Sequence, residues 1–440
     1  MLKHIIYILI ISLPFYGYSF LNVEIRGIRF DWTIIAVLFF LFICSSAIHK
    51  VKIVKNSLFF WLLLFNIALA ASSICPLYSG NSMRIVDYLT TWSQYVVCST
   101  MFFIFLNIRL SIHDLQNILK LYLFMALVVS VFGIIQFVGS YFGVDLYPRF
   151  TNIGEAPPHS SYEHLLGPFK RPTSFFNEPR IFGNFLVTPF IVSFLLFISG
   201  SSLFQNRSYA VVYTIILVLG IILSLSLSAY LCTLILLLIA PWEIIIDKLQ
   251  KLKLRLFIIL LILFTAIYYI TSLTSFSPIF HTYVQARIHS YREGFGLSTY
   301  IYSTVAVLDR WLKSPLTGIG LNNIYPEWAG TSVMPPFQLL GETGIFGAFS
   351  FACFLFVFFS KLSRFRKINT NYELKIFSSI AFVIFISAIV KSFVGSNYGY
   401  SSTWFWFDLA LSGIIYSSLI NKNRKLFASF SSKAPTKVII

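Results

Sequence analysis

Long apolar runs recur from one end of the chain to the other, and this feature limits what the chain can fold into. Many runs reach about 18 residues or more, enough for a helix to cross roughly 30 Å of hydrocarbon. Of the 440 residues, 57% are hydrophobic and only 11% are charged. A soluble protein carries roughly a quarter charged residues. The sequence therefore predicts an all-α polytopic membrane protein.

We expect about twelve transmembrane helices, which together form one integral membrane domain over residues 1–440. The first run follows Lys3 and resembles a signal peptide, but no small-residue cleavage site follows it, so we interpret it as a helix. The predicted spans are 5–20, 32–48, 57–75, 90–108, 118–143, 181–200, 209–225, 228–246, 255–273, 335–359, 376–395 and 403–420.

Positive charge is concentrated in the connecting segments that share a side with both termini. Most of the 33 Lys and Arg residues fall on that side, which the positive-inside rule assigns to the cytoplasm. Most Asp and Glu residues fall on the other side. Because topology accounts for most of the net charge of +17, we expect no nucleic-acid partner. We expect any chemistry to face outward.

Two predicted outer loops, 144–180 and 274–334, are long enough to carry function, because loops over about 12–15 residues are usually functional or disordered. The five cysteines lie in or beside apolar runs, and no spacing of Cys or His resembles a zinc or haem site. The chain contains no D-x-D motif, no ATP-binding G-x-x-x-x-G-K-[ST] motif and no G-x-S-x-G motif. We therefore expect no metal and no cofactor.

The first loop ends in the charged segment KRPTSFFNEPR, residues 170–180. Asn177 followed by Glu178 and Pro179 is typical of a helix start, with Asn177 as the capping residue. The positive end of that helix suits an anion, and Lys170, Arg171 and Arg180 add formal charge beside it. Glu178 could orient Arg171 or accept a proton from a hydroxyl. Alternatively, these side chains only anchor the protein by snorkelling to lipid headgroups.

The second loop contains QARIHSYREGF, in which Arg287 and Arg292 could converge on one anion and His289 could act as a general base. The alternative for His289 is an ordinary loop histidine. Arg310 is a further candidate for binding an anion. Its neighbours Asp309 and Lys313 instead suggest an i,i+4 pair on a solvated amphipathic helix.

SPLTGIGLNN, residues 314–323, predicts a turn in which the backbone of Gly318 and Gly320, with Asn322 close by, approaches a ligand. PPFQLLGETGIFG then opens the tenth span. Glu342 lies about two turns into this span, and an ionisable residue there is a functional candidate by default. Lys391 and Asp408, near the outer ends of the last two spans, could pair with each other.

These motifs resemble the O-antigen polymerase and ligase superfamily of bacterial inner-membrane glycosyltransferases. RPTSFFNEP is similar to the family's segment of an arginine, aromatic residues and Asn/Glu-Pro that opens a helix. SPLTGIG followed by LLGETGIFG is similar to its P-L-x-G-I-G and E-x-G-I-x-G pair. As topology the resemblance covers most of the chain, with large external loops after the fifth and ninth spans.

The sequence departs from the family pattern at two places. Ligases of the family carry a functional histidine shortly before E-x-G-I-x-G, and TSVMPPFQLL has none, which favours a Wzy-like polymerase. The family also commonly has an arginine shortly before P-L-x-G-I-G. Here Arg287 and Arg292 lie further upstream and Arg310 lies nearer, so that residue is not assigned.

The resemblance implies a GT-C-like fold and a metal-independent glycosyltransferase that joins undecaprenyl-diphosphate-linked oligosaccharides on the periplasmic face of the inner membrane. Membrane lipids, and a chain-length regulator protein, would be further partners. The alternatives are a ligase that transfers polymer to lipid A core, or a flippase or secondary transporter. The implied catalytic residues are Arg171, Glu178, Arg292 and Glu342. The implied substrate-binding residues are Lys170, Arg180, Arg287, His289, Arg310, Gly318, Gly320 and Asn322.

Overall fold

Helices dominate the described part of the chain. The computed structural model describes residues 2–15, 19–23, 26–49, 57–72, 82–108, 110–144, 146, 165–166, 169–176, 178–200, 207–239, 297–321, 333–368, 371–394, 399–400 and 402–433. Within these residues, seven helices are long and apolar enough to cross a membrane. They are contained in α2 (Phe30–His49), α5 (Ser82–Asn107), α6 (Ile112–Tyr141), α7 (Pro179–Ser199), α13 (Pro335–Ile368), α14 (Tyr372–Val394) and α15 (Thr403–Lys433). The protein is therefore a helical, polytopic membrane protein.

Shorter apolar helices account for most of the remaining predicted spans. They are α1 (Leu2–Ser12), α3 (Ser57–Ala71), α8 (Arg207–Leu223) and α9 (Leu227–Ile239). Every predicted span except the ninth coincides with a helix, and the ninth lies outside the described residues. A further helix, α12 (Leu297–Trp311), lies within the predicted second loop.

The first predicted span is too long. α1 ends at Ser12 and is followed by the 3-10 turn η1 (Leu13–Phe15), in which Pro14 cannot donate a helical hydrogen bond. An antiparallel hairpin of β1 (Ser19–Val23) and β2 (Arg26–Arg29) then leads into α2. A second hairpin, β3 (Leu165–Leu166) with β4 (Phe169–Lys170), lies in the first predicted loop. The prediction of an all-α chain is confirmed in its main feature, and two small two-stranded sheets accompany the helices.

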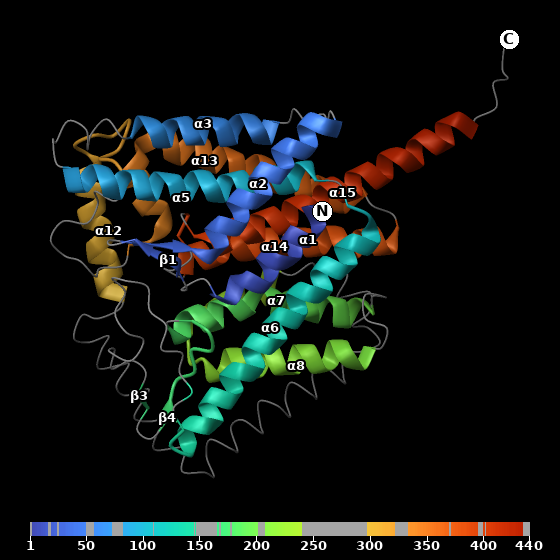
Figure 1. Ribbon diagram of the computed structural model, residues 1–440, viewed down its shortest axis with the longest axis horizontal. Helices are drawn as coiled ribbons and strands as arrows, with labels where there is room; N and C mark the ends of the chain where they lie inside the picture. Colours follow the sequence, from blue (N-terminus) through green and yellow to red (C-terminus); the bar gives the residue numbers. More distant parts are fainter. Residues whose placement is uncertain are drawn as a thin grey trace.

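The helices form two groups. In Figure 1, α3, α5, α13, α14 and α15 lie together in one group, α7 and α8 lie below them, and α6 crosses the second group obliquely. α12 lies across one end, where α6 stops and α7, α13 and α15 start (left in Figure 1). We call this the loop end. α1 begins and α15 ends at the opposite end, so both termini of the described chain share a side.

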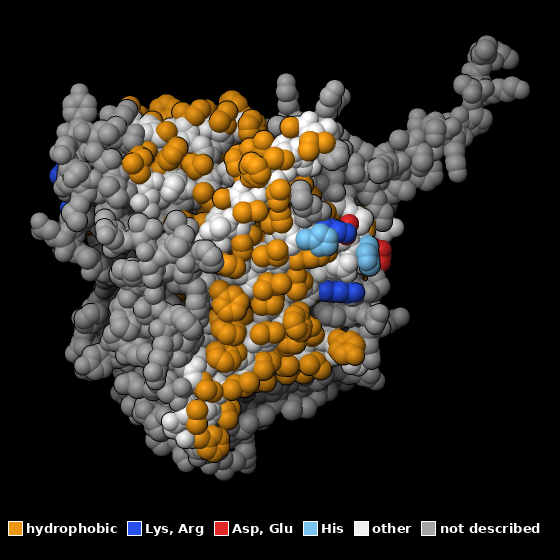
Figure 2. Space-filling model, viewed as in Figure 1, with side chains coloured by type: hydrophobic (Ala, Val, Ile, Leu, Met, Phe, Trp, Pro, Cys, Tyr) orange, Lys and Arg blue, Asp and Glu red, His pale blue; other side chains and the backbone are white. Residues whose placement is uncertain are grey.

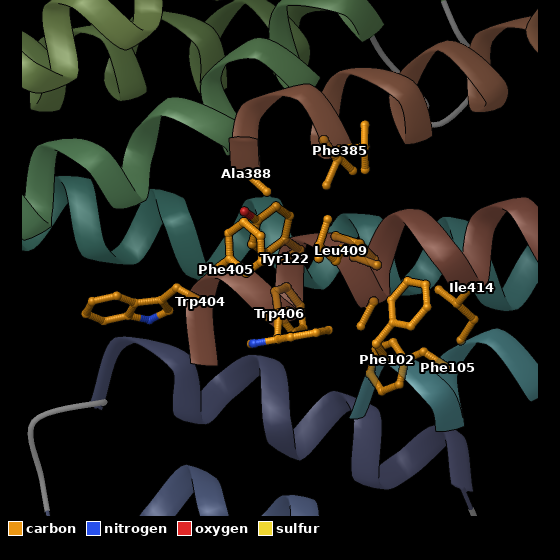
Figure 3. Packing of buried hydrophobic residues seen from close by; sticks show 14 of the residues in the cluster. Phe102, Phe105, Tyr122, Phe385, Ala388, Trp404, Phe405, Trp406, Leu409 and Ile414 are labelled. Atoms are coloured by element: carbon orange, nitrogen blue, oxygen red, sulfur yellow. The ribbon is translucent and has the colours of Figure 1, made fainter. Parts of the chain in front are cut away.

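Aromatic side chains fill the core between α5, α13, α14 and α15. Phe102 of α5 lies edge-on to Phe354 of α13, with ring centroids 5.1 Å apart, and also contacts Trp406 of α15. Figure 3 shows Trp406 and Phe405 pointing into the cluster from α15, with Tyr122 of α6 beside them. Such interlocking rings favour one fixed arrangement of the helices.

The outside of the molecule is apolar where lipid would contact it. Phe39 and Phe40 on α2 and Phe124, Ile135 and Val138 on α6 are exposed. Figure 2 shows hydrophobic side chains over the middle of this face, with charged ones near its edges. Exposing such an apolar surface to water would be unfavourable in free energy, whereas in a bilayer it is the expected contact with lipid.

Candidate functional site

The segment 171–176, which follows β4, folds back into the loop end of the bundle. The amides of Thr173 and Ser174 donate to Oε1 of Gln136 at 3.2 and 2.7 Å, and Nε2 of Gln136 donates to the Ser174 carbonyl at 3.0 Å. Ser174 has a φ of 53°, and its hydroxyl donates to the Val129 carbonyl. Phe176 contacts Trp404 of α15, with ring centroids 5.5 Å apart. The buried Gln136 therefore fixes this segment to α6, a role that the sequence did not indicate.

Arg171 lies inside the protein, with only 2% of its surface exposed. Its Nη2 donates to the carbonyls of Ser224 and Leu225 at 3.1 and 2.8 Å, and its Nε donates to Ser224 at 3.3 Å. Ser224 and Leu225 directly follow α8, which ends at Leu223 and whose dipole is negative there, and Leu225 has a φ of 48°. Arg171 therefore stabilises the turn between α8 and α9 and does not lie on the surface as a headgroup anchor would.

The start of α7 carries an exposed ion pair. Pro179 is the first helical residue and Glu178 occupies the N-cap position with extended backbone, so the predicted capping position is one residue too early. Nη2 of Arg180 lies 3.1 Å from Oε2 of Glu178, and the two side chains are 31% and 42% exposed. Glu178 thus pairs with Arg180 in place of a side-chain cap. Asn177 lies outside the described residues.

The two predicted glycine motifs meet through their backbones. α13 is interrupted at Gly344, whose φ and ψ are 65° and −168°. The turn after α12 bonds to both sides of this break. Ile319 and Gly320 donate to the carbonyls of Gly341 and Glu342 at 2.9 and 3.1 Å. Ile345 and Phe346 donate back to the carbonyls of Pro315 and Leu316 at 2.9 and 3.3 Å.

This arrangement explains the glycines. A Cβ on Gly318 would overlap the backbone of Glu342 and Gly344, and a Cβ on Gly344 would overlap Leu316 and Gly318. An interrupted helix is tolerated in a membrane only if its backbone groups find other partners, and here the turn supplies them. The amides of Gly318 and Gly320 donate to Ser314 and Glu342, so both amides bond within the protein.

Glu342 lies at this interruption and is completely buried. Its Oε1 accepts from Nε2 of Gln338, one turn earlier in α13, at 3.1 Å. The sequence predicted an ionisable group two turns into this helix. The structure adds that its own carbonyl bonds to the glycine turn, so the carboxyl group and the turn are fixed relative to each other.

Among the remaining predicted residues, the structure describes Arg310 and its neighbours Asp309 and Lys313. α12 ends at Trp311, so Lys313 lies in the following turn and forms no described ion pair with Asp309. The predicted i,i+4 pair is therefore wrong. Arg310 lies in the last turn of α12 and is half-buried. Residues outside the described part, or with an undescribed side chain, are Arg287, His289, Arg292, Asn322 and Lys170.

Lys391 and Asp408 form the predicted ion pair, but in the interior. Nζ of Lys391 lies 2.6 Å from Oδ2 of Asp408, and both side chains are less than 5% exposed. Lys391 also donates to the hydroxyl of Thr188 on α7 at 2.7 Å. Thr188 lies 3.1 Å from the Asp408 carboxylate and 2.7 Å from the hydroxyl of Ser387. Thr188 could not be predicted from the sequence, because a lone threonine in an apolar run is common.

Two other titratable side chains at the loop end, Asp31 and Tyr400, contact neighbouring parts of the protein. The buried Asp31 at the start of α2 pairs with Arg29 at 2.8 Å and accepts from Thr403 of α15. Burial raises the pKa of Tyr400, which packs on Phe351, to about 12. The Tyr400 phenol therefore stays protonated at neutral pH and is no candidate base.

Among the described residues, no group of three or more His, Cys, Asp or Glu side chains could hold a metal ion. A scan against known protein-family models finds no match for this chain, and a search of curated proteins finds no similar sequence.

Proposed function

We propose that the protein is a polymerase of O-antigen or a similar surface polysaccharide, with a GT-C-like fold of about twelve spans. It would join undecaprenyl-diphosphate-linked repeat units on the outer face of a bacterial inner membrane. The observation that carries the proposal is the meeting of SPLTGIG with GETG around Glu342. The two motifs, which begin at Ser314 and Gly341, form one backbone unit here, as a shared site requires.

The chemistry would proceed at the loop end. The glycosidic bond between the growing chain and its lipid diphosphate breaks, and a sugar hydroxyl of the incoming unit forms the new bond. The hydroxyl proton passes to a carboxylate, for which Glu342 and Glu178 are the candidates. The diphosphate leaves with added negative charge, which Arg180 and the positive end of α7 would stabilise. Arg171 would act indirectly, by holding the α8–α9 turn and the segment that leads into α7.

A second candidate, a flippase or secondary transporter, is favoured by the buried Lys391–Asp408 pair, since charges inside a membrane domain often mark a transport path. We prefer the enzyme because hydrogen-bonding side chains surround this pair on neighbouring helices, as in a structural network. A ligase for lipid A core is the nearer alternative within the enzyme class.

The test is lipopolysaccharide banding from a deletion strain complemented with wild type, Glu342→Gln or Arg180→Gln, with Lys313→Gln as the control. Glu342→Gln keeps the size of the buried side chain, whereas Arg171→Ala would also disturb the end of α8. We expect a full ladder from wild type and the control. The Glu342→Gln strain should give core plus a single repeat unit.

Loss of every O-antigen band, including the single repeat, in the uncomplemented deletion strain would favour the ligase or the flippase. A full ladder from that strain would contradict the proposal altogether. A wild-type ladder from Glu342→Gln would remove Glu342 from the reaction and leave Glu178 as the candidate base.

A further inference from the structure

The buried network around Lys391 joins helices that are far apart in the sequence. Lys391 and Ser387 belong to α14, Asp408 to α15 and Thr188 to α7. Tyr122 of α6 lies within hydrogen-bonding reach of the Asp408 carboxylate. Since Lys391 contacts Thr188 and Asp408 at 2.7 and 2.6 Å, its ammonium group holds α7 and α15 at one point.

This point lies close to the loop end. Lys391 is in the last turn of α14, and Asp408 is in the second turn of α15. Thr188 lies eight residues after Arg180, which corresponds to about 12 Å along the helix. One layer nearer the loop end, Phe176 packs against Trp404 of α15 and Phe185 of α7. The network therefore lies directly beneath the start of α7.

The residue after Thr188 weakens α7. Pro189 lies inside the helix and has no N–H, so the carbonyl of Phe185 loses its helical donor. A proline in a helix interior permits a kink at that place. The hydrogen bond from Lys391 therefore reaches α7 at Thr188, next to the position where the helix lacks a backbone hydrogen bond.

Burying an ion pair is a poor way to gain stability, because desolvation of the charges offsets most of their attraction. A buried ion pair can instead serve to fix the relative positions of the helices that carry it. A network in which every polar group is hydrogen-bonded provides such a fixed geometry. Here the geometry concerns residues 179–188, which carry Arg180 at the loop end.

We propose that Thr188, Lys391 and Asp408 are positioning residues that lock the first half of α7, residues 179–188, against α14 and α15. The lock compensates for Pro189 and fixes the position of Arg180 and Glu178. The link to catalysis rests on the proposed function, whereas the lock itself does not.

The test measures the position of the α7 start directly. Spin labels are attached through Glu178→Cys and Leu89→Cys, two exposed positions on different helices, in the full-length protein with its five native cysteines replaced. Pulsed electron resonance then gives the distance distribution between the labels. Thr188→Val removes the hydroxyl at nearly constant size, and Thr188→Ser keeps it.

We expect Thr188→Val to broaden or shift the distribution, and Thr188→Ser to leave it unchanged. Adding Pro189→Ala to Thr188→Val should restore the original distribution, because a continuous helix no longer needs the lock. A general loss of stability would not be reversed in this way, so the second substitution separates the two causes.

The proposal is overturned if Thr188→Val gives the wild-type distribution. It is also overturned if Pro189→Ala fails to restore the distribution that Thr188→Val has changed. Failure of the proposed function would be seen elsewhere, in the lipopolysaccharide of the wild-type and deletion strains. The two ideas can therefore fail independently.

Discussion

Two arginines of one charged segment have different surroundings. Arg171 is buried against the carbonyls that end α8, whereas Arg180 shares an exposed ion pair with Glu178. Hydrogen bonds to a buried charged group contribute about 1.5–3 kcal/mol, whereas exposed ion pairs contribute roughly 0–1 kcal/mol. Sequence alone could place both in the segment but could not distinguish them, because the partners of Arg171 come from a turn more than 50 residues away.

We therefore predict that Arg171→Met lowers the free energy of unfolding by about 1.5–3 kcal/mol, while Arg180→Gln lowers it by less than about 1 kcal/mol. Thermal or denaturant unfolding of the purified protein in one detergent measures both. Equal losses for the two variants would show that Arg171 does not hold the α8–α9 turn as described.

The Lys391–Asp408 pair leads to a second prediction at this scale. Lys391→Met alone should destabilise the protein by about 3–5 kcal/mol, because it leaves the Asp408 carboxylate buried without its cation. The double variant Lys391→Met/Asp408→Leu should recover most of this loss. The measurement is the free energy of unfolding of the wild type, the single variant and the double variant. A double variant as unstable as the single one would mean that the charges themselves are needed for folding.

Among the helices, α13 is interrupted at Gly344, and this break shows how two distant motifs depend on each other. α13 continues through Gly344 only because the turn at 315–320 bonds to the backbone on both sides of the break. The long apolar run predicted this span but could not reveal the break, since hydropathy does not report backbone dihedrals. It also placed most other spans within a few residues. It failed at the end of α1, which stops at Ser12 just before Pro14, because an apolar composition continues past the proline.

The glycine contacts predict a strong effect of adding one methyl group. Gly344→Ala and Gly318→Ala each force a Cβ onto facing backbone, so we expect little folded protein and no ladder. Gly143→Ala is the matched control. Gly143 also has a positive φ, of 73°, but no atom lies within 4 Å of its added Cβ. The control should lose only the roughly 1–2 kcal/mol of left-handed strain. Fluorescence size-exclusion profiles compare the three, and normal Gly344→Ala protein would contradict the interlocked backbones.

At the scale of the whole molecule, the described chain places α1 and the end of α15 opposite the loop end. From the charge distribution and the positive-inside rule we expect the terminal side to face the cytoplasm. We predict that Lys313→Cys, in a cysteine-free background, reacts with a membrane-impermeant maleimide once the outer membrane is opened. Lys120→Cys, exposed in the first turns of α6, should react only after the inner membrane is permeabilised. The reverse pattern would place the candidate site in the cytoplasm.

We propose above that Glu342 and the interlocked glycine motifs serve glycosidic bond formation at the loop end. The most direct measurement reconstitutes the purified protein in liposomes with undecaprenyl-diphosphate-linked repeat units and follows the products by mass spectrometry. We expect oligomers of repeat units, with one undecaprenyl diphosphate released for each bond formed, and neither product from Glu342→Gln. Wild-type protein that is folded and reconstituted but releases no undecaprenyl diphosphate would contradict the proposal.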